Sequence, residues 1–123
     1  MTGRFTGRVA VVAGSGSGIG AAVAATFATQ GASVVVVDQD AAAAARVSAA
    51  IAATGAIAVP FVADVATEDG AAGMVAYAVE RFGTLDILHN NAFGMQAGLL
   101  EDITLDGWNE TLRLTLTSAF LGT

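Results

Sequence analysis

A glycine-rich turn joining an apolar run to a helix-forming segment constrains the fold more than any other feature. The turn reads Gly-Ser-Gly-Ser-Gly-Ile-Gly over residues 14–20. Residues 8–13 before it form a short, nearly continuous apolar run rich in valine, which is typical of a strand covered on both faces. Residues 19–30 after it place apolar side chains at helical spacing, and Gly31 follows as a helix terminator. This order predicts a βαβ unit in a parallel sheet.

The rest of the chain repeats the alternation of strands and helices. Further strands are predicted at residues 33–38, 56–63 and 85–90, with helices at residues 40–54, 67–82 and 104–123. Pro60 lies within the third strand and favours an edge position, because proline cannot donate to a strand ladder. The predicted fold class is therefore α/β, a Rossmann-type parallel sheet with helices on both faces. We expect one domain over residues 1–123, truncated after the fourth strand and the helix that follows it.

Charge and residue counts exclude several classes of function. The chain has 123 residues, a formal net charge of -6 and five basic residues, all arginine. Acidity argues against a nucleic-acid partner, because affinity for phosphate backbones comes largely from Lys and Arg. With no cysteine and His89 as the single histidine, no metal site is expected. No apolar run approaches the roughly 20 residues of a membrane span, and the first eight residues lack a signal-peptide core, so we expect a cytoplasmic protein without membrane contact.

The glycine turn and the acid at the end of the second strand together predict a dinucleotide site. A pyrophosphate binds where a helix N-terminus follows such a turn. Asp38 closes the strand at residues 33–38, where a carboxylate accepts hydrogen bonds from both hydroxyls of the adenosine ribose. An alternative is that Asp38 is a turn residue capping the next helix. The nearby positions provide no arginine for a 2′-phosphate, which favours NAD over NADP: Ser15, Ser17, Gln39 and Asp40.

Three segments resemble those of the short-chain dehydrogenase/reductase family. Residues 13–20 match its T-G-x-x-x-G-x-G motif, with Ala13 in place of threonine, although residues 16–21 also satisfy the looser G-x-G-x-x-A pattern of other dinucleotide-binding proteins. Asp64-Val65 follows the third strand, like the family's Asp-Val pair. Residues 89–93 resemble its N-N-A-G segment, with Phe93 in place of glycine. The chain is similar to the amino-terminal half of this family over essentially its whole length.

This resemblance implies roles for individual residues. Asp64 and Val65 are implied to receive the adenine ring, and Asn91 and Ala92 to lie beside the cofactor, whereas Phe93 adds bulk to the cofactor channel or the substrate cleft. The cofactor expected is NAD. The predicted binding residues are Gly14, Ser17, Gly18, Ile19, Gly20, Asp38, Asp64, Val65, Asn91 and Ala92.

The family's catalytic residues are not expected to be complete in this chain. They are a serine and a Y-x-x-x-K pair in which the cation lowers the tyrosine pKa, and the sequence contains no lysine. Tyr77 and Arg81 have the same spacing but lie in a predicted helix far from the site, and the pKa of arginine is too high for this relay. Residues 108–122 resemble the helix that carries the family's asparagine, with Thr115 at that position. Trp108 in this helix is expected to pack.

Two hypotheses for function follow. In the first, the chain is the NAD-binding portion of an oxidoreductase that transfers hydride between NAD(H) and an alcohol or carbonyl substrate, and is inactive alone. In the second, it is a non-catalytic remnant that binds NAD or a partner. Hydrophobic residues make up 54% of the chain and charged residues 13%. A sheet buried on both faces accounts for part of this excess. We expect the remainder to mediate self-association through the final helix.

Overall fold

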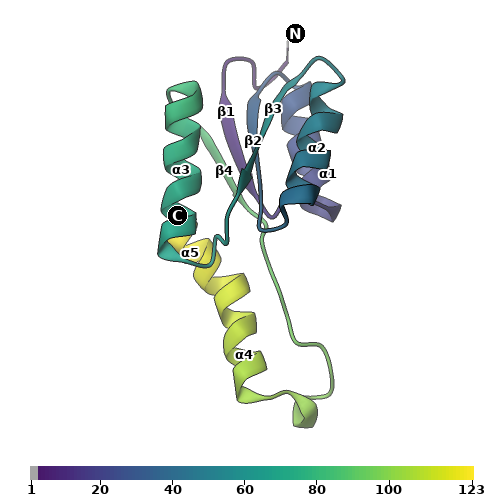
Figure 1. Cartoon of the computed structure of the whole chain (residues 1–123), viewed down its shortest axis with the longest axis vertical. Coiled ribbons are helices and arrows are strands. Elements are labelled where there is room, and N and C mark those ends of the chain that lie inside the picture. The colour runs from purple at the N-terminus through teal and green to yellow at the C-terminus, as the bar shows by residue number, and fades with distance from the viewer. Residues whose placement is uncertain (1–2) are drawn as a thin grey trace.

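The computed structural model describes residues 3–123 and shows a four-stranded parallel sheet between helices (Figure 1). The strand order is β3-β2-β1-β4, and every neighbouring pair is parallel. From β1 the chain runs through β2 to β3 at one edge of the sheet. It then crosses to the opposite side of β1 and forms β4, which creates a switch point at the carboxyl ends of β1 and β4. The predicted fold class is confirmed. The strands are β1 (Val9–Ala13), β2 (Ser33–Asp38), β3 (Ile57–Val62) and β4 (Ile87–Asn90).

Three helices cover the two faces of the sheet. Helices α1 (Gly18–Thr29) and α2 (Ala41–Ala52) lie on one face, and α3 (Glu68–Phe82) lies on the other (Figure 1). The Thr67 hydroxyl accepts a hydrogen bond from the Gly70 amide and so caps α3, as predicted. No helix within residues 3–123 combines the length and the apolar character that crossing a lipid bilayer requires.

The two central strands are buried on both faces, and their alternating side chains build two separate cores. Val34 and Val36 pack toward α1 and α2, where Ala24 of α1 is fully buried. Val35 and Val37 pack on the opposite side, against Met74 and other residues of α3. This arrangement explains why β1 and β2 appear in the sequence as continuous apolar runs instead of alternating patterns.

The edges of the sheet follow from local hydrogen bonding. β3, which contains Pro60, occupies one edge as predicted, and β4 occupies the other in the part of the chain that the structure describes. β4 begins at Ile87, two residues later than predicted. Asp86, just before it, bonds to Val9 twice: its amide donates to the Val9 carbonyl at 3.0 Å, and its carboxylate accepts the Val9 amide at 2.9 Å and also pairs with Arg8.

The last part of the chain extends away from the sheet (Figure 1). An irregular stretch after β4 contains one 3-10 turn (Leu100–Asp102), and Thr104 then caps α4 (Leu105–Leu112) by accepting the Gly107 amide. The sequence predicted one helix from there to residue 123. Instead, a π-helical turn (Arg113–Thr117) separates α4 from α5 (Ser118–Gly122). Such wider turns often occur at functional sites.

Met74 offers a test of the core on the α3 side. Its side chain is fully buried, and truncation leaves a cavity between α3 and the sheet. Met74→Ala is expected to lower the free energy of unfolding by about 2–5 kcal/mol. Val79→Ala, on the same helix but 46% exposed, is the matched control and should cost no more than about 0.5 kcal/mol in a urea titration. Equal losses for the two variants would contradict this packing.

Candidate functional site

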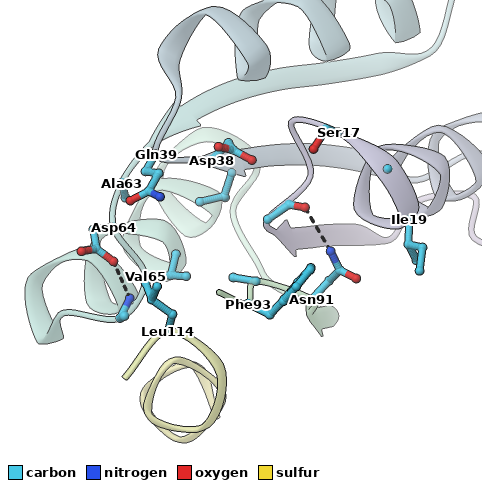
Figure 2. A pocket seen from close by; sticks show the side chains of 15 residues that line it. Ser17, Ile19, Asp38, Gln39, Ala63, Asp64, Val65, Asn91, Phe93 and Leu114 are labelled. Atoms are coloured by element: carbon cyan, nitrogen blue, oxygen red, sulfur yellow. Dashed lines mark hydrogen bonds between the residues drawn. The ribbon is translucent and has the colours of Figure 1, made fainter. Parts of the chain in front are cut away.

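A cavity of about 470 Å³ lies at the carboxyl ends of the strands (Figure 2). Its volume falls within the roughly 300–1,000 Å³ of small-molecule sites. Every predicted binding residue except Gly20 lines it, together with side chains that the sequence did not indicate, above all Leu114. The lining residues are Gly14, Ser17, Gly18, Ile19, Val37, Asp38, Gln39, Ala63, Asp64, Val65, Ala66, Asn91, Ala92, Phe93 and Leu114.

Hydrogen bonds fix one side of the glycine turn to β2, and the other side of the turn faces the cavity. The amides of Gly14 and Ser15 both donate to the Val37 carbonyl, at 2.9 and 3.0 Å. The buried Ser15 hydroxyl accepts the Val37 amide at 3.0 Å. Ser17 is exposed, and a Cβ placed on Gly18 would meet nothing within 4 Å. The open side of the turn, at the start of α1, is thus free to receive an anion.

Packing explains three of the glycines better than contact with a phosphate does. A Cβ on Gly14 would lie 2.7 Å from the Cα of Ala92, and one on Gly16 would lie 2.7 Å from Asp38 Oδ2. A Cβ on Gly20 would collide with the Gly14 carbonyl and lie 2.7 Å from the Asn91 amide nitrogen. Gly20 is buried beneath the turn, so its contribution is to let α1 approach β1 and β4 closely.

Asp38 holds the glycine turn in place. Its Oδ2 accepts the Gly16 amide at 2.9 Å, and its Oδ1 accepts the Asp40 amide at 3.0 Å. The cap of α2 is Asp40, which accepts the Ala43 amide at 3.1 Å. Asp38 is therefore not the helix-capping residue of the alternative interpretation. Each of its oxygens keeps a second acceptor position, and the half-buried side chain lines the cavity.

Arg46 is a neighbour of this site that sequence reasoning missed. Its Nη2 lies 3.5 Å from the Gly16 carbonyl, although it comes from the middle of α2. Within residues 3–123 it takes part in no ion pair. A cation therefore lies near the turn, although the sequence positions beside the turn contain no arginine. Its position depends on how α2 packs across the turn, which local sequence does not show.

At the other end of the cavity, Asp64 is tied to the last part of the chain. Its Oδ1 accepts the Ala66 amide at 3.0 Å, and its Oδ2 pairs with Arg113 at 3.0 Å. Arg113 also pairs with Glu110 at 2.9 Å. The hydrogen bond from Arg113 lowers the pKa of the Glu110 carboxyl, and the bonds to Glu110 and Asp64 raise the pKa of Arg113. The neighbouring Val65 is buried.

The segment after β4 forms a further wall of the cavity. The Asn91 side chain donates to the Gly14 carbonyl at 3.0 Å (Figure 2), which joins this segment to the glycine turn. Phe93, at the position of the family's glycine, is 71% exposed and lines the cavity. Thr115 does not line it. Its hydroxyl donates to the Gly94 carbonyl at 2.9 Å and so holds the wall from outside.

Two aromatic side chains lie away from the cavity. Tyr77 on α3 stacks on Phe61 of β3 at 4.9 Å between ring centroids, so it serves the packing of α3. Trp108 on α4 is 53% exposed, and the expectation that it packs is wrong for the chain as described. α4 extends beyond the sheet, so no described element covers this ring.

The fold, the glycine turn and the cavity at the switch point define a Rossmann-type α/β protein with a candidate dinucleotide site. The family model for short chain dehydrogenase matches residues 8–123, and the chain belongs to this family. Family members bind a nicotinamide cofactor, NAD or NADP. The predicted relationship is thereby confirmed.

Several proteins of this family are similar to the chain. Versicolorin reductase 1 of Dothistroma septosporum is 42% identical over 118 residues, which cover 95% of this chain and 45% of that protein. D-threitol dehydrogenase of Mycolicibacterium smegmatis is 39% identical, with 96% of this chain and 45% of that protein covered. The crystal structure of a short chain dehydrogenase from Mycobacterium avium superposes with a TM-score of 0.93 at 37% identity, covering 98% of this chain and 44% of that one. The chain thus spans about half the length of these relatives.

Gly20→Ala tests whether packing demands the glycine. Gly20 lies in a helix without a positive φ, so alanine would by propensity alone stabilise the protein. Because of the collision with the Gly14 carbonyl, we expect instead a loss of about 1–3 kcal/mol in the free energy of unfolding. Gly7→Ala is the control: it meets no atoms but has a φ of +78°, so it should cost about 1 kcal/mol from backbone strain. A stabilised Gly20→Ala variant would show that the turn does not depend on this contact.

Proposed function

We propose that this chain is the NAD-binding portion of a short-chain dehydrogenase acting on an alcohol or carbonyl substrate. The observation that carries the proposal is the open side of the glycine turn at Ser17 and Gly18, which faces one cavity together with Asp38 and Asp64. The amides at the start of α1 and the helix dipole favour an anion there. Two carboxylates on the same cavity favour neutral hydroxyl and amino groups farther along the ligand.

The predicted residues fit the parts of a dinucleotide. Ser17, Gly18 and Ile19, at the start of α1, bind the pyrophosphate, while Asp38 accepts hydrogen bonds from the adenosine ribose. Asp64 and Val65 receive the adenine. Asn91, Ala92 and Phe93 lie at the opposite wall, and we assign that wall to the nicotinamide half. When bound, NAD would supply the hydride acceptor of the reaction.

The preference for NAD over NADP rests on Asp38. Its carboxylate holds the Gly16 amide and still has acceptor positions for ribose hydroxyls. A 2′-phosphate would place a second negative charge against it. Arg46 beside the Gly16 carbonyl opposes this effect, so the preference for NAD is the balance of one carboxylate and one guanidinium.

Turnover requires residues that this chain does not contain. The sequence has no lysine, and Thr115 replaces the asparagine of the family's relay and bonds to Gly94. We therefore propose that the chain by itself binds NAD without catalysing hydride transfer. Binding without catalysis also fits the alternative, a non-catalytic NAD-binding or partner-binding remnant. A protein of NAD-dependent metabolism without cysteine fits the cytoplasm.

Calorimetric titration of the chain with NAD and NADP tests the proposal. The wild type should bind NAD more tightly than NADP. Asp38→Ala should reduce the ratio of the NADP dissociation constant to the NAD dissociation constant about tenfold, which is equivalent to removing one unfavourable charge contact of about 1.4 kcal/mol. Arg46→Ala should widen it. Asp69→Ala, on α3, removes the same charge away from the cavity and should leave the ratio unchanged.

Two outcomes of this titration would contradict different parts of the proposal. No heat and no thermal shift at millimolar NAD would end the cofactor proposal. An unchanged ratio in a folded Asp38→Ala variant would end the ribose assignment alone.

The final helices also support the proposal of self-association. Four large apolar side chains recur every four residues across α4, the π turn and α5, and all are more than one third exposed: Trp108, Leu112, Leu116 and Phe120. Spacing of this kind places side chains along one side of a helix. A continuous apolar surface on the outside of a protein usually marks an interface, and we propose a second copy of the chain as its occupant.

Light scattering with size-exclusion chromatography tests this surface. The wild type should elute as an oligomer, and Leu116→Glu/Phe120→Glu should shift it to the monomer mass, because burying two unpaired carboxylates is costly. Leu100→Glu alters an equally exposed leucine outside the four-residue repeat and should remain oligomeric. A wild type that is monomeric at all concentrations would contradict the proposal.

A further inference from the structure

The π-helical turn places three consecutive side chains on three different partners. Arg113 reaches Asp64 in the loop between β3 and α3. Leu114 enters the cavity, where Figure 2 shows it beside Val65. Thr115 bonds to Gly94 in the segment after β4. One turn of helix therefore connects two walls of the cavity and contributes a side chain between them.

Arg113 makes most of the connection to the Asp64 loop. Its Nη1 donates to Asp64 Oδ2 at 3.0 Å and to the Ala66 carbonyl at 3.3 Å. Its Nε and Nη2 form two parallel bonds to the Glu110 carboxylate, each 2.9 Å long. Glu110 thus fixes the plane of the guanidinium, and the third nitrogen is directed at the loop. Lysine, with a single charged nitrogen on a flexible stem, cannot make all of these contacts at once.

The same contacts determine what Asp64 presents to a ligand. Oδ1 accepts the Ala66 amide and Oδ2 accepts Arg113, so the carboxylate is held at both oxygens. An ionised carboxylate accepts about four hydrogen bonds, which leaves acceptor positions for an amino group in the cavity. Without Arg113 the carboxylate would keep its bond to the Ala66 amide at Oδ1 but would lose the bond that holds Oδ2.

We propose that Arg113 is a positioning residue for the adenine end of the cavity, fixing the Asp64 carboxylate and seating Leu114 against Val65. The proposal rests on the proposed function for the identity of the ligand. The positioning itself is a property of the free protein and can be tested without a ligand. Arg113 does not line the cavity, so it acts through Asp64 and Leu114.

The first experiment measures hydrogen exchange of the free chain by NMR. The amides to follow are Ala66, bonded to Asp64, and Gly94, bonded to Thr115. Arg113→Met should raise their exchange rates about fivefold, the effect of losing one partly exposed ion-pair network. In Arg113→Lys the exchange rates of these amides should lie between those of the wild type and those of Arg113→Met. Arg81→Met, which removes an exposed cation on α3, is the control and should change neither amide.

The second experiment is a double-mutant cycle on NAD affinity. Arg113→Met should weaken NAD binding about tenfold, and Arg113→Lys should restore part of the loss. In an Asp64→Asn background the same change should have an effect of less than about twofold, because the carboxylate that Arg113 orients is gone. A general structural role for Arg113 would instead give the same loss in both backgrounds.

The two experiments separate the two proposals. If the wild type binds no NAD, the proposed function fails, and hydrogen exchange alone decides whether Arg113 positions the loop. If the exchange rates of Ala66 and Gly94 are unchanged in Arg113→Met, the positioning proposal is overturned whether or not NAD binds. Additive losses in the cycle overturn it as well.

Discussion

The contact between Gly14 and the segment after β4 is the interaction on which the site depends. The Gly14 carbonyl accepts the Asn91 side chain at 3.0 Å, and only glycine leaves room for Ala92 against its Cα. Gly20 packs under the same carbonyl. The end of β1, the start of α1 and the end of β4 therefore meet at one point. Gly14, Asn91 and Ala92 at this point all line the cavity.

Sequence alone predicts whatever is determined by local preference. The valine runs of β1 and β2, the Thr67 cap and the glycine after α3 are each specified by a few adjacent residues, and the structure contains them all. The positions of Asp38 and Asn91 follow as well, because parallel strands end at the same side of the sheet. Most of the site's framework is local in this sense.

The parts that sequence reasoning missed depend on contacts between distant segments. Arg113 and Asp64 lie 49 residues apart, and Arg46 and Gly16 lie 30 residues apart. Helical spacing gives the direction of a side chain relative to its own helix, not the placement of that helix against the sheet. The π turn is of the same kind, since it occurs where Arg113 and Thr115 bond to two separate loops.

The final helices present two different sides. Arg113, Leu114 and Thr115 face the cavity walls, whereas Leu116 and Phe120 are largely exposed. A partner covering the exposed side would lie beside Thr115, which is itself exposed, whereas the bond from Arg113 to Asp64 is part-buried. Such a partner would alter cofactor affinity by displacing the helix, and the cofactor would then alter partner affinity by the same factor, because coupling between two binding sites is reciprocal. A helix held at Arg113 by Glu110 and Asp64 resists such displacement, so the geometry favours independent binding at the two sides.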